Sequence, residues 1–107
     1  MRISVLSALV MSCVATGVAA QTTPPDYSAP AGAPYTAQHV YIRTKAGHVL
    51  AGTLTMPTQG RRPIAAVVTI SGSSPQDRDH NTPSGGKYRF FRQLADTLGR
   101  RNIAVLR

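Results

Sequence analysis

The central part of the chain contains two short runs in which apolar and polar residues alternate. A period of two is typical of a half-buried strand. Between the runs lies Lys45-Ala46-Gly47, where glycine can adopt the positive φ that a tight turn requires. The pattern therefore predicts an antiparallel hairpin that starts at Gln38 and ends at Pro57. The residues expected on one side of its two strands are Val40, Ile42, Thr44, Leu50, Leu54 and Met56.

Beyond the hairpin the pattern changes from alternation to longer apolar segments. Residues 64–70 (IAAVVTI) are apolar at nearly every position, as in a strand covered on both faces. From about Tyr88 to Arg101, apolar residues recur at helical spacing and predict a helix. Ile103–Leu106 then begins another apolar strand. A strand, a long loop, a helix and a strand in this order predict a right-handed βαβ unit, and hence the α/β fold class.

The first twenty residues have the pattern of a secretory signal peptide. Met1-Arg2 supplies a positive charge, residues 3–14 are almost wholly apolar, and Val18-Ala19-Ala20 provides the small residues of a cleavage site. The apolar stretch is too short and too weakly flanked for a stable membrane anchor. We therefore expect cleavage after Ala20 and a periplasmic or extracellular location. Lipidation of Cys13 is the alternative, but the two residues before it fit that poorly.

Residues 21–37 differ in composition from the segments on either side. They hold four of the eight prolines of the chain and few residues that could contribute to a core. Such a composition predicts an extended, mobile linker. The sequence thus divides into a signal peptide at 1–20, a Pro/Ala-rich linker at 21–37 and one small folded domain at 38–107.

The charge and the cysteine count exclude some kinds of protein and suggest another. The 107 residues include 12 Lys+Arg against 4 Asp+Glu, a formal charge of +8, and one cysteine excludes a disulfide framework or a cysteine zinc site. A small cationic exported protein that binds a polyanion or an anionic surface is therefore one candidate. However, the charges are scattered and lack the aromatic interleaving of nucleic-acid stacking platforms. We expect no nucleic-acid partner.

The connection from Ser71 to Lys87 is the richest source of candidate chemistry. Ligands of open α/β sheets bind at the carboxyl ends of strands, and a loop longer than about 2–6 residues there is often functional. Gly72 and its small neighbours leave backbone N–H groups that could stabilise an oxyanion. The spacing G-x-G-x-x-G and the string Gly-Lys-Ser/Thr are both missing, so we expect no nucleotide cofactor. We expect no metal either. A plain surface loop is the alternative.

Several strings along residues 38–107 match one known family. They are Ala51-Gly52-Thr53-Leu54, Ile70-Ser71-Gly72-Ser73, Pro75-Gln76-Asp77-Arg78-Asp79, Leu94-Ala95-Asp96-Thr97-Leu98 and Ile103-Ala104-Val105-Leu106-Arg107. Together they resemble the N-terminal third of a bacterial α/β-hydrolase of the dienelactone-hydrolase and serine-aminopeptidase-like type. Ser74 and Asn102 depart from this family, which usually has glycine at both positions. Asparagine can take the left-handed conformation that commonly ends a helix, and we expect it at Asn102. The resemblance implies a hairpin plus one βαβ unit of a hydrolase sheet, interrupted in its fourth strand.

The resemblance also implies a chemistry, the hydrolysis of carboxylic esters or related acyl bonds. By position, the backbone N–H of Ser73 would be one oxyanion donor, with Gly72 allowing close approach. The second donor follows the nucleophile of a G-x-S-x-G elbow. This chain has no such elbow. In the nearest string, residues 72–76 (GSSPQ), Gln76 occupies the position of the motif's second glycine. We therefore assign no catalytic residue and expect the chain to be inactive alone.

The remaining candidate side chains favour structural roles. Asp77, Arg78 and Asp79 bracket the long loop, where ion pairs and turn hydrogen bonds are a commoner role than substrate binding. His39 and His48 are expected at the surface, and His80 in the loop is only a weak functional candidate.

The resemblance finally implies a strand order. Ile103–Leu106 would lie between the hairpin and residues 64–70, with the helix on one face of the sheet. The outer edge of residues 64–70 and the other sheet face would then have no partner, which predicts marginal stability and a tendency to aggregate. The sequence does not predict an oligomeric state.

Overall fold

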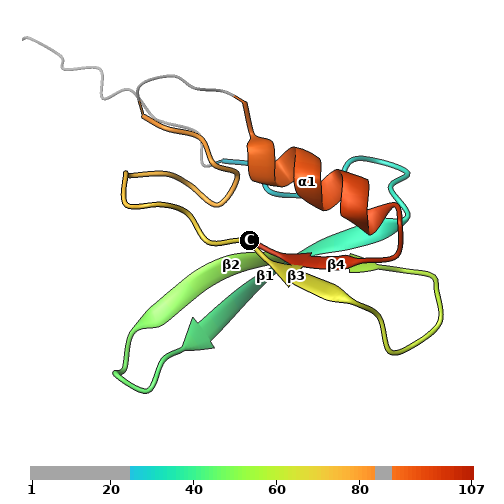
Figure 1. Cartoon of the computed structure of the whole chain (residues 1–107), viewed down its shortest axis with the longest axis horizontal. Coiled ribbons are helices and arrows are strands. Elements are labelled where there is room, and N and C mark those ends of the chain that lie inside the picture. Colours follow the sequence, from blue (N-terminus) through green and yellow to red (C-terminus); the bar gives the residue numbers. More distant parts are fainter. Residues whose placement is uncertain (1–24, 84–87) are drawn as a thin grey trace, which may run out of the picture.

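The computed structural model of the chain describes residues 25–83 and 88–107, and the predicted signal peptide lies outside these ranges. They form four strands and one helix (Figure 1). In chain order, these are β1 (Tyr35–Arg43), β2 (Val49–Pro57), β3 (Ala66–Val68), α1 (Phe90–Gly99) and β4 (Ala104–Leu106).

The predicted hairpin is confirmed, with one change at its start. β1 and β2 pair antiparallel from Tyr35↔Pro57 to Arg43↔Val49, around a turn in which Gly47 has a φ of 88°. β1 begins at Tyr35, three residues before the predicted start at Gln38. The segment before Gln38 was predicted as linker because of its prolines, but the last of them, Pro34, directly precedes the strand. Proline commonly stands at such a boundary.

The four strands form one mixed sheet in the order β1-β2-β4-β3. β4 pairs antiparallel with β2 and parallel with β3, and α1 lies between β3 and β4 in the chain. The prediction of an α/β arrangement is therefore confirmed at this level. The order also agrees with the expected position of the last strand between the hairpin and the strand at 66–68.

α1 is shorter than the predicted helix and ends as the sequence suggested. It starts after Arg89, whose φ of 44° is left-handed and whose side chain makes no capping hydrogen bond. It is followed by Asn102 with a φ of 61°, which confirms the expected left-handed residue beyond the helix end. The amide of Ile103 returns to the carbonyl of Leu98 at 3.0 Å, so the chain reverses directly into β4.

α1 packs on β2 and β4, and this contact makes the small core of the domain. The contact requires glycine at position 99. A Cβ there would lie 2.8 Å from Cδ1 of Tyr35 and 3.1 Å from Cγ2 of Thr55. The buried residues of the domain lie in or beside this layer, and they include Tyr35, Thr53, Thr55, Ala95, Ala104 and Val105.

The strand predicted at residues 64–70 differs most from expectation. Only Ala66–Val68 are in strand conformation, and all three are exposed. The prediction of a strand covered on both faces is wrong here because β3 lies at the edge of the sheet, while α1 packs on β2 and β4. Val68 is 63% exposed and the nearby Ile70 is 84% exposed. The expected edge position of this segment is confirmed.

Residues 25–34 lie against the folded domain although they contain no strand or helix. The guanidinium group of Arg92 donates to the backbone carbonyls of Asp26 and Ser28, and the guanidinium carbon of Arg78 lies 4.4 Å from the ring centre of Tyr27. These contacts lie on the α1 side of the sheet. The mobility that composition suggests for this segment stays a prediction.

Candidate functional site

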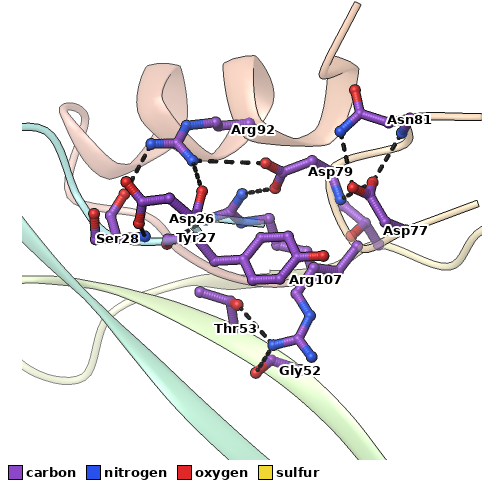
Figure 2. A network of polar contacts seen from close by, with 12 residues as sticks. Asp26, Tyr27, Ser28, Gly52, Thr53, Asp77, Asp79, Asn81, Arg92 and Arg107 are labelled. Atoms are coloured by element: carbon purple, nitrogen blue, oxygen red, sulfur yellow. Dashed lines mark hydrogen bonds and ion pairs between the residues drawn. The ribbon is translucent and has the colours of Figure 1, made fainter. Parts of the chain in front are cut away.

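The loop that follows β3 is held in place by three consecutive side chains, Asp77, Arg78 and Asp79. Each of them contacts a different part of the molecule. Figure 2 shows Asp77 within the loop itself and Asp79 between Arg92 and Arg107. These are the residues for which the sequence favoured a loop-structuring role.

Asp77 closes a local turn. Its Oδ1 accepts hydrogen bonds from the amides of Asp79 and Asn81, both at 2.9 Å, and its Oδ2 accepts one from Nδ2 of Asn81 at 2.8 Å. Burial raises the pKa of this carboxyl, but the hydrogen bonds from Asn81 and Asp79 outweigh it and hold the pKa below its ordinary value. Asp77 is therefore an ionised side chain whose acceptors are already occupied by its own loop.

Arg78 connects the loop to the hairpin. Its Nη1 donates to the carbonyl of Gly52 at 2.9 Å and to Oγ1 of Thr53 at 3.1 Å, both on β2. The same nitrogen lies 3.2 Å from Nδ1 of His39 on β1. The face of its guanidinium group covers the ring of Tyr27. Arg78 thus holds together β2, β1 and the segment that precedes the sheet.

Asp79 forms a buried ion pair. Its carboxylate is 2% exposed, its Oδ1 accepts a hydrogen bond from Nη1 of Arg107, and its Oδ2 lies 3.6 Å from Nη1 of Arg92 (Figure 2). Burial raises the pKa of Asp79, and the charges of Arg107 and Arg92 oppose this rise. Burial likewise lowers the pKa of Arg107, and the charge of Asp79 opposes it. The pair connects the loop to the residue that follows β4.

The candidate oxyanion donors occupy an open position. Gly72 and Ser73 are exposed, and they follow the last residue that extends the β3–β4 ladder, Thr69, whose amide donates to the carbonyl of Leu106 at 2.8 Å. A Cβ on Gly72 would meet no atom within 4 Å. The backbone of this stretch is thus accessible at the carboxyl end of β3, where the sequence placed the candidate site.

The histidines lie in three different places. His39 is exposed on β1 and His48 is exposed beside the hairpin turn, as the sequence predicted. His80 has a left-handed φ of 67° and its ring centre lies 4.9 Å from that of Phe91. Its Nδ1 is buried without a hydrogen-bond partner. In residues 25–83 and 88–107, there is no group of three His, Cys, Asp or Glu side chains that could hold a metal ion.

A groove of about 580 Å³ lies beside α1 and is lined by residues of the helix together with Pro30 and Tyr35. Three arginines line it, but two are already engaged: Arg92 by backbone carbonyls and Asp79, and Arg100 by Asp96 at 3.0 Å. At its floor, the hydroxyl of Tyr35 donates to Oδ1 of Asp96 at 2.6 Å. Most of the charged side chains in the groove are therefore already paired with groups of the protein itself.

The contact between Tyr35 and Asp96 gives a testable dependence on pH. Burial, together with the hydrogen bond to Asp96, raises the pKa of Tyr35 to about 12. Because a free tyrosine ionises at about pH 10, the stabilisation of the folded state by Tyr35 should be complete below that pH and disappear as the pH rises through about 12. We expect the difference in unfolding free energy between the wild type and Tyr35→Phe to stay constant from neutral pH to about 9 and then shrink. A difference that persists unchanged above the pKa of Tyr35 would contradict this assignment; Tyr41→Phe, at a 74% exposed position, is the control.

Sequence reasoning missed half of this network. Arg92, Arg107 and Tyr27 were not singled out, although they complete the contacts of Asp79 and Arg78. The one signal for Arg107 was its position directly after an apolar strand, where a charge must either reach solvent or find a partner. Nothing in the local sequence marked Tyr27.

Comparison with protein-family models, with curated proteins and with solved structures finds no match for the chain. Across the described residues, no helix is both long enough and apolar enough to span a membrane.

Proposed function

We propose that this chain forms the N-terminal part of an exported serine hydrolase that acts on carboxylic esters or related acyl bonds. The observation that carries the proposal is the placement of the loop after β3. Its Asp77-Arg78-Asp79 segment is fixed to β2 and to the residue after β4, while Gly72 and Ser73 stay exposed at the carboxyl end of β3. Exposed backbone N–H groups at the carboxyl end of a strand, next to an anchored loop, suit the oxyanion of acyl transfer.

The proposed chemistry assigns a limited role to this part of the chain. The amide of Ser73 would donate to the carbonyl oxygen of a bound acyl group as negative charge develops on it. A nucleophile, a general base and the second oxyanion donor have no counterpart in the sequence. The side chains around the loop support the same division, because Asp77, Arg78 and Asp79 are all engaged in holding the backbone.

The isolated chain is therefore expected not to turn over an activated ester such as p-nitrophenyl acetate above the buffer rate. It should also resist stoichiometric labelling by a fluorophosphonate, which reports an activated serine. A chain carrying Ser73→Ala and a chain carrying Ser74→Ala are the controls, and both should behave like the wild type. Saturable turnover that either substitution abolishes would overturn the proposal.

A further inference from the structure

The end of the hairpin that carries the turn projects beyond the rest of the sheet. β4 pairs with β2 at Leu54 and Thr55. Toward the turn, this pairing ends at Thr53, which exchanges two backbone hydrogen bonds with Arg107. Beyond that point, β1 and β2 pair only with each other among the described residues, and Figure 1 shows their turn at the lower left, away from α1. We call residues 41–51 the hairpin tip.

The hairpin tip exposes large apolar side chains on both faces of the sheet. Tyr41 and Val49 are on the α1 side, because they share the strand periodicity and pairing of Tyr35, which contacts the helix. They are 74% and 52% exposed. Ile42 and Leu50 are paired with each other on the opposite face and are 44% and 55% exposed. The tip is therefore apolar and accessible on both sides, beyond the reach of α1.

The charges of the hairpin tip are all positive. Arg43 and Lys45 stand on either side of the start of the turn, and neither forms an ion pair with another of the described residues. The sequence has no Asp or Glu between Asp26 and Asp77, so the whole hairpin lacks negative charge. Anionic lipid headgroups attract basic residues of this kind. The aliphatic stems of the two side chains can lie along the apolar surface while their charged ends reach the headgroups.

The backbone amides of the turn have partners within the turn itself. The amide of Thr44 donates to the carbonyl of His48 at 2.8 Å, and the amide of Gly47 donates to the carbonyl of Thr44 at 3.0 Å. The amide of His48 donates to Oγ1 of Thr44 at 3.1 Å. These three groups therefore need no water, and the turn can enter surroundings that hydrate it poorly.

The length of the hairpin tip suits the headgroup region of a bilayer. Tyr41 lies three residues before Thr44, where the turn begins, so at about 3.3 Å per residue it is about 10 Å from the turn. Amphipathic elements at membrane surfaces are buried by about 5–10 Å at the boundary between headgroups and acyl chains. Tyrosine is one of the two side chains enriched at that level.

We propose that the hairpin tip inserts into the surface of a bilayer that contains anionic lipids. Its apolar side chains enter between the headgroups, while Arg43 and Lys45 contact the lipid phosphates. The observation that selects a bilayer is the exposure of apolar side chains on both faces, because lipid surrounds an inserted tip whereas a protein partner covers one face of a sheet. The binding is peripheral and reversible, and the inference is independent of the proposed hydrolase function.

The absence of tryptophan from the chain allows a local test. Tyr41→Trp places one fluorophore on the hairpin tip, and Ile70→Trp places one at an 84% exposed apolar position outside it. Each full-length variant is mixed with vesicles of phosphatidylcholine, or of phosphatidylcholine with phosphatidylglycerol, in which some acyl chains are brominated. We expect the emission of Tyr41→Trp to shift to shorter wavelength and to be quenched in the anionic vesicles, and that of Ile70→Trp to stay unchanged. Because the signal is local, it distinguishes insertion of the tip from binding by the apolar residues 3–14.

Charge variants in the Tyr41→Trp chain test the role of the two cations. Arg43→Gln together with Lys45→Gln should weaken the partition into anionic vesicles about 25-fold, since each basic residue near such a surface contributes about fivefold. Arg61→Gln together with Arg101→Gln removes the same charge at exposed positions outside the tip and should weaken it much less. Added salt should also weaken it, because salt screens the attraction.

Four results would overturn the proposal. They are a Tyr41→Trp emission that lipid does not quench, equal quenching of the two fluorophores, equal losses from the two pairs of charge substitutions, and equal insertion into vesicles of phosphatidylcholine alone. The first of these would leave the tip as a surface for a protein partner. If Tyr41→Trp does not fold by circular dichroism, Val49→Trp repeats the measurement on β2.

Discussion

Replacing Asp79 with alanine is expected to destabilise the domain by about 3–5 kcal/mol, the cost of leaving a buried charge without its partner. The charge left behind is that of Arg107, which is 8% exposed. The Nε of Arg107 is already buried without a partner, so the guanidinium group has little hydration to replace the lost carboxylate. Because native domains are stable by only about 5–15 kcal/mol, a loss of this size should shift the urea midpoint of a small domain most of the way to zero.

Two comparisons isolate the contribution of the Asp79–Arg107 ion pair: one with the exposed Asp26, and one in which both charges of the pair are removed. Asp26→Ala removes a carboxylate from an exposed position and should change the unfolding free energy by less than about 1 kcal/mol. The double variant Asp79→Leu with Arg107→Met replaces both charges by apolar groups and should recover most of the loss. If Asp79→Ala unfolds completely, Asp79→Asn keeps one acceptor and allows a smaller shift to be measured. Equal effects of Asp79→Ala and Asp26→Ala would show that the ion pair does not anchor the loop.

Gly99→Ala is expected to lower the stability by about 1–2 kcal/mol, although alanine is the better helix former. Overpacking typically costs about 1–3 kcal/mol, and the gain from replacing a helical glycine is about 0.5–1 kcal/mol. The packing term dominates because the new Cβ would lie 2.8 Å from the ring of Tyr35, a distance at which either the ring or α1 must shift. The thermal midpoint, and the near-ultraviolet circular dichroism of the tyrosines, report the change.

Two further variants test whether the space beside Gly99 is responsible. Gly72→Ala introduces the same methyl group where no atom lies within 4 Å, and it should be neutral or slightly stabilising. Thr55→Ser removes the Cγ2 that lies 3.1 Å from the new Cβ, so it should recover part of the stability of Gly99→Ala. A Gly99→Ala chain that is as stable as the wild type would mean that α1 does not pack closely on the sheet.

The order of elements could be predicted from the sequence because each depends on local patterns. Alternation in residues 38–57 indicated the hairpin, and helical spacing after Tyr88 indicated α1. Asn102 was correctly expected to be left-handed, since that conformation is intrinsic to the residue and its place after a helix. The hairpin, α1 and the conformation of Asn102 can therefore be predicted without knowing which distant residues are in contact.

The face that became buried could not be predicted in the same way. Alternation shows which side chains share a face, and the apolar side of the hairpin was the natural candidate for burial. In the structure, α1 instead packs on the opposite face, where Gly99 lies so close to Tyr35 and Thr55 that a Cβ would not fit. Sequence pattern alone does not say where a helix ninety residues into the chain will pack.

The candidate site was predicted only in part for a similar reason. The loop and its Asp77-Arg78-Asp79 string were recognisable from composition and resemblance. Their partners were not, because Arg107 lies 28 residues from Asp79 and Gly52 lies 26 residues from Arg78. Such long-range pairs follow from the strand order, which local periodicity does not determine.

The position of β4 in the sheet has a consequence for how the protein is made. β4 is synthesised after β1, β2 and β3, yet it lies between β2 and β3 and pairs with both. Until residues 104–107 have left the ribosome, β3 lacks the strand it pairs with here and Asp79 lacks Arg107. The nascent chain therefore carries a complete hairpin and an unpaired apolar segment at 64–70 while residues 71–103 are being synthesised. Chaperone binding in that interval would fall on the segment that later becomes the β3 edge.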